Sequence, residues 1–226
     1  MAPSKLGKAE LQESIKRGMM RLAHRQEITE AVGEEMEREA VRFDRLREDS
    51  SKPRAVVAFN LFQTPEDIAA RMVTLADIRD GQKILEPSAG LGRIYRAIKQ
   101  KTTASHITLV ENAPQCCAEL YRETEGDTGA RLIQGDWLEI TPAETQGFDR
   151  IVMNPPFKMG RDVKHIAHAM KFLKPGGLLV SLCYNGARQN RDLKPIADTW
   201  EVLPAGSFRE SGTNAEVCLL TIKGGN

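Results

Sequence analysis

The chain of 226 residues lacks any apolar run approaching the ~20 residues that a membrane-spanning helix needs. Residues 1–5 lead into charged sequence and not into an apolar signal region. The cysteines are few, and none of the four is spaced Cys-x-x-Cys. We therefore expect a cytoplasmic protein with no membrane association, with reduced thiols and with no metal site.

An excess of charge of one sign is also missing, since the formal net charge is +1. A global balance of this kind neither demands nor excludes a nucleic-acid partner, because a polyanion responds to local clusters of Lys and Arg. The apolar fraction of 41% is enough for a substantial core in a chain of this length. A globular protein with one domain and an appendage is the expectation.

Residues 1–52 have a helical pattern, with Leu11, Ile15, Met19 and Leu22 at steps of three and four residues. Their 11 Lys or Arg are matched by 11 Asp or Glu, so the excess positive charge of a DNA-binding arm is missing. We expect an N-terminal helical extension over residues 1–52 that serves in packing, in self-association or in binding a protein partner. Residues 53–226 form the second domain of this prediction.

From residue 80 onward, short apolar runs alternate with helical stretches, and a mainly parallel sheet covered by helices on both faces follows. The last two strands are close together in sequence and predict an antiparallel terminal hairpin. The expected strands are 82–86, 106–111, 131–134, 148–153, 177–184, 200–204 and 214–223. The expected helices are 91–101, 114–123, 162–173 and 189–199.

A turn rich in small residues links the first strand to its helix and contains Gly90 and Gly92. Such a turn lets a ligand approach the backbone closely and presents the amides of a helix N-terminus. Tyr95 stands where the dinucleotide fingerprint has its third glycine, which disfavours a pyrophosphate ligand.

Acidic residues follow the next two strands. Glu111 ends the second strand about twenty residues after the glycines, where such folds bind ribose hydroxyls. Asp136 follows the third strand and can accept from an adenine amino group, while Trp137 either packs on that ring or is part of the core. All these positions lie at the carboxyl ends of strands, where open α/β sheets bind ligands.

The tetrapeptide Asn154-Pro155-Pro156-Phe157 directly follows the fourth strand. The Asn side-chain carbonyl and a proline-flanked backbone carbonyl can together accept both hydrogens of a planar amino group, and Phe157 can stack on its ring. The alternative interpretation is a turn that only terminates the strand.

In this order, the motifs resemble those of the class I S-adenosylmethionine-dependent methyltransferases, and within them the amino-group methyltransferases that carry Asn-Pro-Pro-Phe/Tyr. The resemblance runs from about Phe59 to the C-terminus. It implies a Rossmann-like α/β fold with a mainly parallel seven-stranded sheet and an antiparallel terminal strand, and S-adenosylmethionine as cofactor.

The resemblance also implies site residues. Those at the acceptor are Asn154, Pro155, Pro156 and Phe157. Those at the cofactor are Gln63, Thr64, Pro65, Glu86, Pro87, Ser88, Ala89, Gly90, Gly92, Glu111, Asn112, Asp136, Trp137 and Asn154. Within these sets Glu86 is expected near the methionine amino group, Glu111 at the ribose and Asp136 with Trp137 at the adenine.

Thr64-Pro65 precedes the glycine loop and is similar to the Thr-Pro motif of adenine-N6 DNA methyltransferases. Taken from the residues alone, it is a helix start with Thr64 as N-cap and Pro65 at the first helical position. The resemblance therefore favours adenine N6 in DNA as the acceptor. A target-recognition domain of substantial size is missing after the core, which implies low or short sequence specificity.

Basic side chains on the same side of the sheet suit phosphate contacts beside an extruded base, although a solvated surface is the alternative. The predicted substrate-binding residues are Lys158, Arg161, Lys164, Arg188, Arg191 and Arg209, and His165 and Lys194 lie among them in sequence. The sequence leaves open an RNA base-amino methyltransferase, a protein glutamine methyltransferase, and a cofactor-binding regulatory module without catalysis.

Overall fold

The computed structural model describes residues 62–103, 106–142 and 147–225. The N-terminal extension expected over residues 1–52 lies outside these ranges, so its helices stay a prediction. Within the described residues no helix has both the length and the apolar character to cross a membrane.

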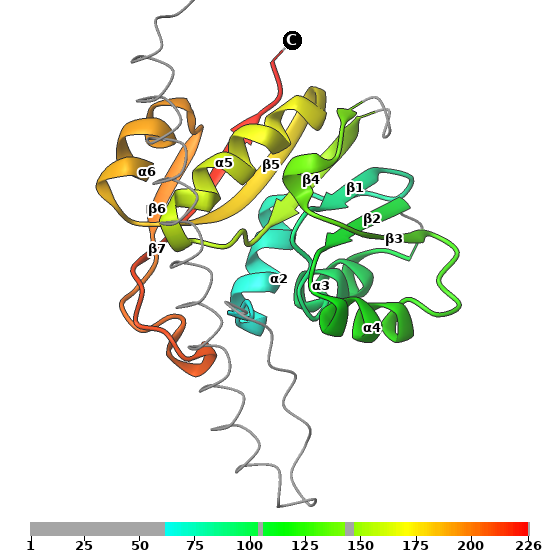
Figure 1. Cartoon of the computed structure of the whole chain (residues 1–226). Coiled ribbons are helices and arrows are strands. Elements are labelled where there is room, and N and C mark those ends of the chain that lie inside the picture. Colours follow the sequence, from blue (N-terminus) through cyan, green and yellow to red (C-terminus); the bar gives the residue numbers. More distant parts are fainter. Residues whose placement is uncertain (1–61, 104–105, 143–146, 226) are drawn as a thin grey trace, which may run out of the picture. The chain divides into compact units, whose positions relative to one another are not determined.

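Seven strands form one sheet in the order β3-β2-β1-β4-β5-β7-β6 (Figure 1). Strands β1 to β5 are parallel to one another, whereas β7 pairs antiparallel with both β5 and β6. The predicted fold class and the antiparallel terminal hairpin are confirmed. The strands are β1 Lys83–Glu86, β2 His106–Glu111, β3 Ala130–Gln134, β4 Phe148–Met153, β5 Leu173–Tyr184, β6 Thr199–Val202 and β7 Val217–Lys223.

Five α-helices and several 3-10 turns connect the strands in the described part of the chain. The helices are α2 Glu66–Leu75, α3 Arg93–Lys101, α4 Pro114–Glu123, α5 Arg161–Ala169 and α6 Ala187–Asp192. The 3-10 turns are η1 Trp137–Glu139, η3 Lys158–Gly160, η4 Met170–Phe172, η5 Lys194–Ile196 and η6 Arg209–Ser211.

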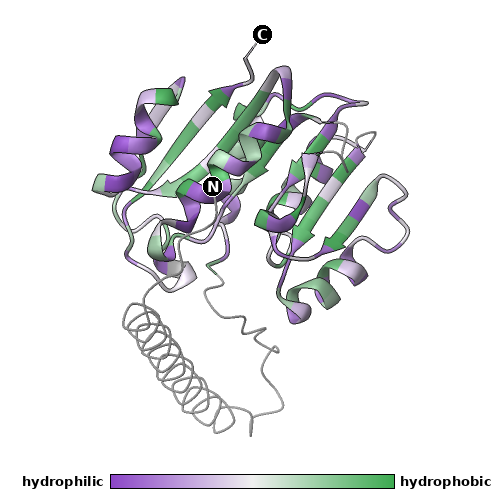
Figure 2. Cartoon of the chain, turned by 45° about the horizontal axis from the view of Figure 1, so that its top comes forward, coloured by the Kyte–Doolittle hydropathy of each residue, from purple (hydrophilic) through white to green (hydrophobic). Residues whose placement is uncertain are grey.

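Alternate residues of the central strands enter two separate hydrophobic clusters, one on each face of the sheet. On β1, Ile84 joins the cluster shared with α2, α3 and α4, while Leu85 joins the cluster shared with α5 and η4. On β4, Val152 and Met153 divide in the same way. Figure 2 shows the strands as largely hydrophobic, as expected for parallel strands that helices cover on both faces.

Several element boundaries differ from the sequence prediction. The expected helix 162–173 ends at Ala169 and continues as η4, because Leu173 already pairs with Phe148 at the start of the long strand β5. The expected helix 189–199 is reduced to α6 followed by η5, which has Pro195 in its first turn. The N-cap of α2 is Pro65 and not Thr64, whose hydroxyl contacts another part of the chain.

All four cysteines are buried and unpaired. Cys116 and Cys117 belong to α4, on the side that packs toward the sheet. Cys183 and Cys218 face each other directly across the antiparallel pair β5–β7. Burial raises the pKa of the Cys116 and Cys218 thiols to about 11 each. All four are buried structural side chains with free thiols.

Candidate functional site

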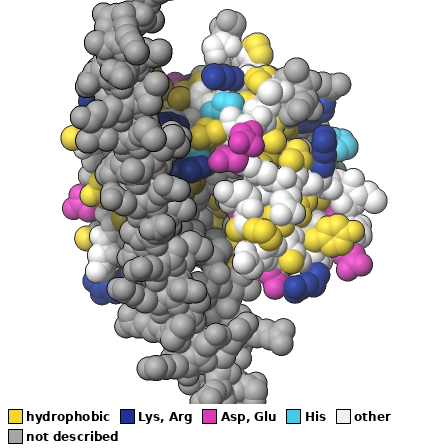
Figure 3. Space-filling model, in the orientation of Figure 1, with side chains coloured by type: hydrophobic (Ala, Val, Ile, Leu, Met, Phe, Trp, Pro, Cys, Tyr) yellow, Lys and Arg dark blue, Asp and Glu magenta, His cyan; other side chains and the backbone are white. Residues whose placement is uncertain are grey.

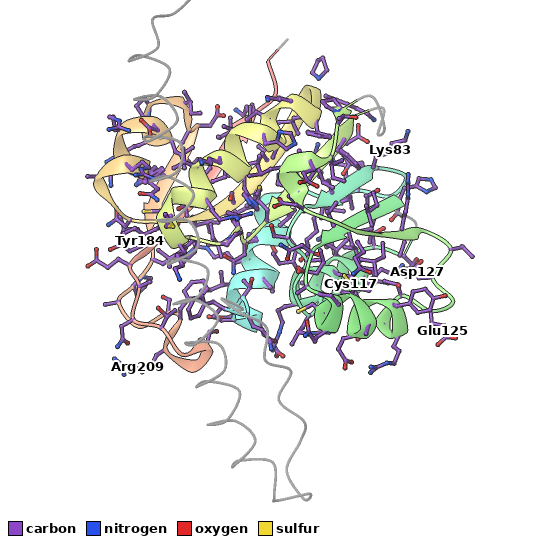
Figure 4. All side chains as sticks on the ribbon, in the orientation of Figure 1. Lys83, Cys117, Glu125, Asp127, Tyr184 and Arg209 are labelled. Atoms are coloured by element: carbon purple, nitrogen blue, oxygen red, sulfur yellow. The ribbon has the colours of Figure 1, made fainter. Side chains whose placement is uncertain are left out.

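The loops after β1 to β5 and the β6–β7 connection meet at one edge of the sheet, because the parallel strands all end there. Figure 4 labels Lys83 at the opposite, amino end of β1 and Tyr184 at the carboxyl end of β5, which marks the two edges. Segment 62–65, which precedes α2, reaches the same carboxyl edge through its contacts with Asn154. Residues far apart in sequence are thereby placed together.

Asn154 follows β4 and is held by two hydrogen bonds from its side-chain amide. Its Nδ2 donates to the Phe62 carbonyl oxygen at 3.2 Å and to Thr64 Oγ1 at 3.1 Å. A backbone carbonyl can only accept, so the NH₂ group must be the one that faces Phe62. Asn154 Oδ1 is therefore the atom that remains for an external donor, and no group in the described ranges donates to it.

The residues that follow Asn154 are packed against the core and hold its backbone in place. Pro155 is buried, and Phe157 is partly buried against the cluster that contains Val152. Without a backbone N–H, Pro155 and Pro156 cannot extend the sheet ladder, so β4 ends at Met153. The turn thus presents an oriented amide and a partly exposed aromatic ring at the carboxyl edge.

Segment 62–65 is itself anchored from two sides. Gln63 Oε1 accepts from Arg93 Nη2 at 3.1 Å, which ties the segment to α3. Ser211 Oγ donates to the Gln63 carbonyl at 2.6 Å, which ties it to the β6–β7 connection. Gln63 and Thr64 thereby link α3, which follows the glycine loop, to the acceptor turn. The cofactor role of Gln63, Thr64 and Pro65 stays a prediction.

The glycine loop after β1 closes against the end of β2. Gly90 and Gly92 have φ of 54° and 75°, in the left-handed region that glycine tolerates. The Gly90 amide donates to Glu111 Oε2 at 2.8 Å, and the amides of Asn112 and Ala113 donate to Glu111 Oε1 at 2.9 and 2.8 Å. Three backbone donors fix this carboxylate at the edge where the sequence expects a ribose contact.

Glu86, at the end of β1, is 1% exposed. Burial, reinforced by the nearby Glu111 carboxylate, raises the pKa of Glu86 well above its usual range, although an amide hydrogen bond from Tyr95 acts in the opposite direction. Glu86 Oε2 has no hydrogen-bond partner within the described residues. A buried acceptor without a donor is costly, and a donor from a bound ligand would satisfy it.

Asp136 and Trp137 follow β3 in different environments. Asp136 Oδ1 accepts from the Leu138 amide and Oδ2 from Arg161 Nη2 at 3.2 Å. Burial alone would raise the pKa of Asp136, but the Leu138 amide and the Arg161 charge lower it. Trp137 is 2% exposed, its indole N–H donates to the His165 carbonyl, and its ring lies 4.6 Å from Phe172 between centroids. Trp137 is a core residue, which is the second of the two roles that the sequence left open.

Several predicted phosphate contacts have other partners. Arg161 pairs with Asp136, and Arg191 pairs with Asp192. His165 is 4% exposed, and burial, with the Arg161 charge, lowers its pKa to about 4, so it is neutral near pH 7. Figure 3 shows acidic and basic side chains interspersed on the described part of the visible surface. We correct His165 from a surface cation to a buried neutral imidazole.

The remaining predicted cations are placed at or near the carboxyl edge. Arg188 in α6 donates from Nη1 to the Met159 carbonyl at 2.8 Å. Lys158 follows Phe157, Lys164 is exposed on α5, and Figure 4 labels Arg209 on the β6–β7 connection. Basic side chains therefore lie along this edge, and the Asp136 and Asp192 carboxylates partly neutralise Arg161 and Arg191.

The model of the methyltransferase small domain matches residues 63–206 of the chain, which is more than half of it. The chain belongs to this family. The matched range begins at Gln63, takes in the glycine loop, Glu111, Asp136 and the Asn154 turn, and ends in the β6–β7 connection. The predicted class I S-adenosylmethionine-dependent methyltransferase family is thereby confirmed, and with it S-adenosylmethionine as the cofactor.

Ribosomal RNA small subunit methyltransferase A from Borreliella afzelii is 29% identical over 133 residues, which are 57% of this chain and 45% of that protein. The chain thus matches about half the length of this curated relative. TrmN from Thermus thermophilus superposes with a TM-score of 0.58 at 20% identity, over 70% of this chain and 48% of that one. An RNA methyltransferase from Salinibacter ruber, solved with S-adenosyl-L-homocysteine, gives 0.53 at 17% identity, over 73% and 94%. The two structures show a shared fold.

The residues at this edge fit S-adenosylmethionine. The unpartnered buried Glu86 Oε2, the oriented Glu111 carboxylate and the left-handed glycines of the loop offer acceptors and a close backbone approach. The sequence interpretation missed the Phe62 carbonyl and the left-handed conformation of Met159. A backbone carbonyl leaves no trace in residue types, and no pattern marks a methionine for a positive φ.

Proposed function

We propose that this methyltransferase transfers a methyl group to an exocyclic amino nitrogen of a nucleobase, namely N6 of adenine in RNA. The orientation of Asn154 supports the amino acceptor, because its Oδ1 is left to accept once Nδ2 is engaged by Phe62 and Thr64. The choice of RNA is supported by two similar proteins, the Borreliella afzelii ribosomal RNA methyltransferase and the Salinibacter ruber RNA methyltransferase. The preference for DNA expected from Thr64-Pro65 gains no support from these relatives.

S-adenosylmethionine supplies the methyl group when bound. We place its methionine part near Glu86 and segment 63–65, its ribose at Glu111, and its adenine beside Asp136. The other predicted cofactor residues, Pro87, Ser88, Ala89 and Asn112, flank these positions on the same loops. The fixed loops hold the donor in line with the acceptor, which is the main demand that methyl transfer makes on a protein.

An exocyclic amino group is a weak nucleophile because its lone pair is delocalised into the ring. In our proposal Asn154 Oδ1 and the Pro155 carbonyl accept its two hydrogens and stabilise the charge that develops on nitrogen. Phe157 packs on the ring and keeps it from turning. The proton then leaves to water, since the proposal assigns no general base.

The substrate is tested by incubating the full chain with labelled S-adenosylmethionine and separate pools of RNA, DNA and protein, followed by digestion to nucleosides and amino acids. We expect label in N6-methyladenine from RNA. Label in N6-methyladenine from DNA alone would restore the DNA preference, and label in methylglutamine would favour the protein alternative. Absence of N6-methyladenine from both nucleic acids contradicts the proposal.

The acceptor mechanism is tested by Asn154→Ala. Loss of a single preorganised polar group at a reacting centre lowers kcat by roughly 100- to 1,000-fold, and we expect a loss of this order. Binding of S-adenosylmethionine, measured by calorimetry, should change little. The matched control is Asn190→Ala in α6, whose side chain bonds to Asn185 and Gly186 and not to segment 62–65. Turnover by Asn154→Ala near that of the unaltered chain would exclude this mechanism.

A further inference from the structure

Met159 has an unusual backbone for its residue type. Its φ is 58° and its ψ is 23°, and it shares positive φ among the described non-glycine residues only with Asp77. An aspartate tolerates this region through local hydrogen bonds, whereas an unbranched apolar side chain gains nothing from it. Backbone strain of this kind persists where the surrounding structure imposes it, and it gathers at functional sites.

The strained turn is in contact with α6. Arg188 Nη1 donates to the Met159 carbonyl oxygen at 2.8 Å. The same guanidinium lies against Gly160, where an added Cβ would clash with it. Arg188 therefore ties to α6 the two residues after Lys158 that have a left-handed backbone, Met159 and Gly160.

That side chain is 84% exposed, more than any other large hydrophobic side chain in the described ranges. Phe62 and Tyr184, each 41% exposed, stand on two other segments of the same carboxyl edge. Met159 is also flanked in sequence by Lys158 and, two positions on, by Arg161. An apolar side chain that is exposed to solvent five positions after the acceptor amide suits contact with nucleobases rather than with protein core.

We propose that Met159 is a stacking wedge that enters the base stack at the place vacated by the target adenine. This inference deepens the proposed function and rests on it. A base inside a helical stack cannot reach Asn154 unless it is extruded, and extrusion leaves its neighbours without a stacking partner. Apolar side chains, methionine among them, insert between base steps in proteins that unstack nucleic acids. The substrate class is therefore an adenine stacked within a helical segment of RNA.

The experiment uses one RNA strand that the unaltered chain methylates, measured alone and annealed to its complement. We expect Met159→Ala to lower kcat/KM on the annealed strand by about tenfold or more, and on the strand alone by less than about twofold, because only the annealed base must leave a stack. Met159→Leu keeps an apolar side chain and should retain most activity on both. Tyr121→Ala removes a 70% exposed ring on α4 and serves as the control for lost surface area.

A second readout replaces the target adenine by 2-aminopurine in the annealed strand. Its fluorescence rises on unstacking, and we expect the rise on binding to be smaller for Met159→Ala than for Met159→Leu. Equal losses on both strand forms, no loss on either, or an annealed strand that the unaltered chain does not methylate would each overturn the wedge. A chain that methylates no RNA overturns the proposed function and the wedge with it. A thermal midpoint shared by all variants excludes misfolding as the cause.

Discussion

Asn154 takes its orientation from the Phe62 carbonyl and the Thr64 hydroxyl, which lie 92 and 90 positions earlier in the chain. Thr64 is 4% exposed, and its hydroxyl accepts from the Asn154 amide. The sequence assigned Thr64 to the cofactor and, as an alternative, to the N-cap of α2. The N-cap is Pro65, and the contact gives Thr64 a different role, that of a positioning residue for the acceptor amide.

Thr64→Val keeps the shape of the side chain and removes one of the two acceptors for Asn154 Nδ2, while the Phe62 carbonyl stays. We expect kcat to fall by roughly tenfold, which corresponds to about 1.4 kcal/mol of transition-state stabilisation. Thr64→Ser restores the hydroxyl and should restore most of kcat. KM for S-adenosylmethionine should move little in either variant. A rise in that KM with kcat unchanged would assign Thr64 to the cofactor alone.

The buried Glu86 carboxyl makes stability depend on pH. Its folded pKa is raised, so above its unfolded value the unfolded chain loses a proton that the folded chain keeps. The free energy of unfolding therefore falls as pH rises from the unfolded pKa of Glu86 toward its folded pKa, by up to about 1.4 kcal/mol per pH unit for one group. Glu86→Gln removes this slope, so its stability relative to the unaltered chain should grow from pH 5 to pH 8.

Urea unfolding of the cofactor-free chain at pH 5, 6, 7 and 8 measures this effect. Glu125→Gln removes an exposed carboxylate and controls for the general loss of one negative charge. If Glu86→Gln and the unaltered chain show parallel pH profiles, the carboxyl is ionised in the folded state throughout the range.

At the scale of elements, alternation of apolar runs and helical stretches was sufficient to predict the strands. The predicted bounds of β2 and β4 equal those observed. Each strand has a buried apolar centre, which is Ile107, Leu109 and Val110 in β2 and Ile151, Val152 and Met153 in β4. The predicted bounds are wrong where pairing between strands, and not local sequence, decides where a strand begins. Strand β5 begins at Leu173, ahead of Lys174-Pro175-Gly176-Gly177, a run whose composition suggests a turn. Pairing across the sheet is a long-range event that local composition does not report.

In the candidate site, too, the local sequence predicted the residue types but not the long-range contacts. Glycines, acids and the Asn154 turn could be read from residue types, since each chemistry needs a particular side chain. The partners of these side chains could not be predicted in this way, because the Arg161–Asp136 pair and the burial of His165 depend on how α5 packs against β5 and η1. Phosphate binding by the predicted basic residues stays a prediction, with Arg161 and Arg191 paired to carboxylates in this structure.

The start of α3 depends on Gly92, which has φ of 75° and packs against α4. An alanine there would place its Cβ 3.0 Å from Leu120 Cδ2 in addition to adopting a left-handed backbone. We expect Gly92→Ala to lower the free energy of unfolding by about 2 kcal/mol or more, of which about 1 to 2 kcal/mol comes from the backbone.

Gly81→Ala is the matched control, since Gly81 has φ of 78° and nothing within 4 Å of an added Cβ. The difference between the two variants in urea unfolding isolates the contact with Leu120. Equal destabilisation would mean that Leu120 moves aside without cost and that α3 and α4 are loosely packed.

At the scale of the whole molecule, a sheet with a separate hydrophobic cluster on each face supports an edge on which all the site loops meet. The division into an N-terminal helical extension over residues 1–52 and a catalytic domain over residues 53–226 stays a proposal. So does a role of the extension in self-association or in binding a partner. The chain's near-neutral charge is consistent with the interspersed ion pairs on its surface.

The reactivity of the four buried cysteines can be used to measure local unfolding of the chain. A thiol-specific reagent modifies the thiolate, and burial both hides these sulfurs and raises the pKa of each. Labelling should therefore wait for the chain to open, and its rate should follow the free energy of opening. We expect Cys116 and Cys117 on α4 to react before Cys183 and Cys218 at the centre of the sheet, as peptide mass mapping over time would show. If the β5–β7 pair reacts first, the sheet opens from its antiparallel side, and the edge that carries Tyr184 is the first part of the fold to yield.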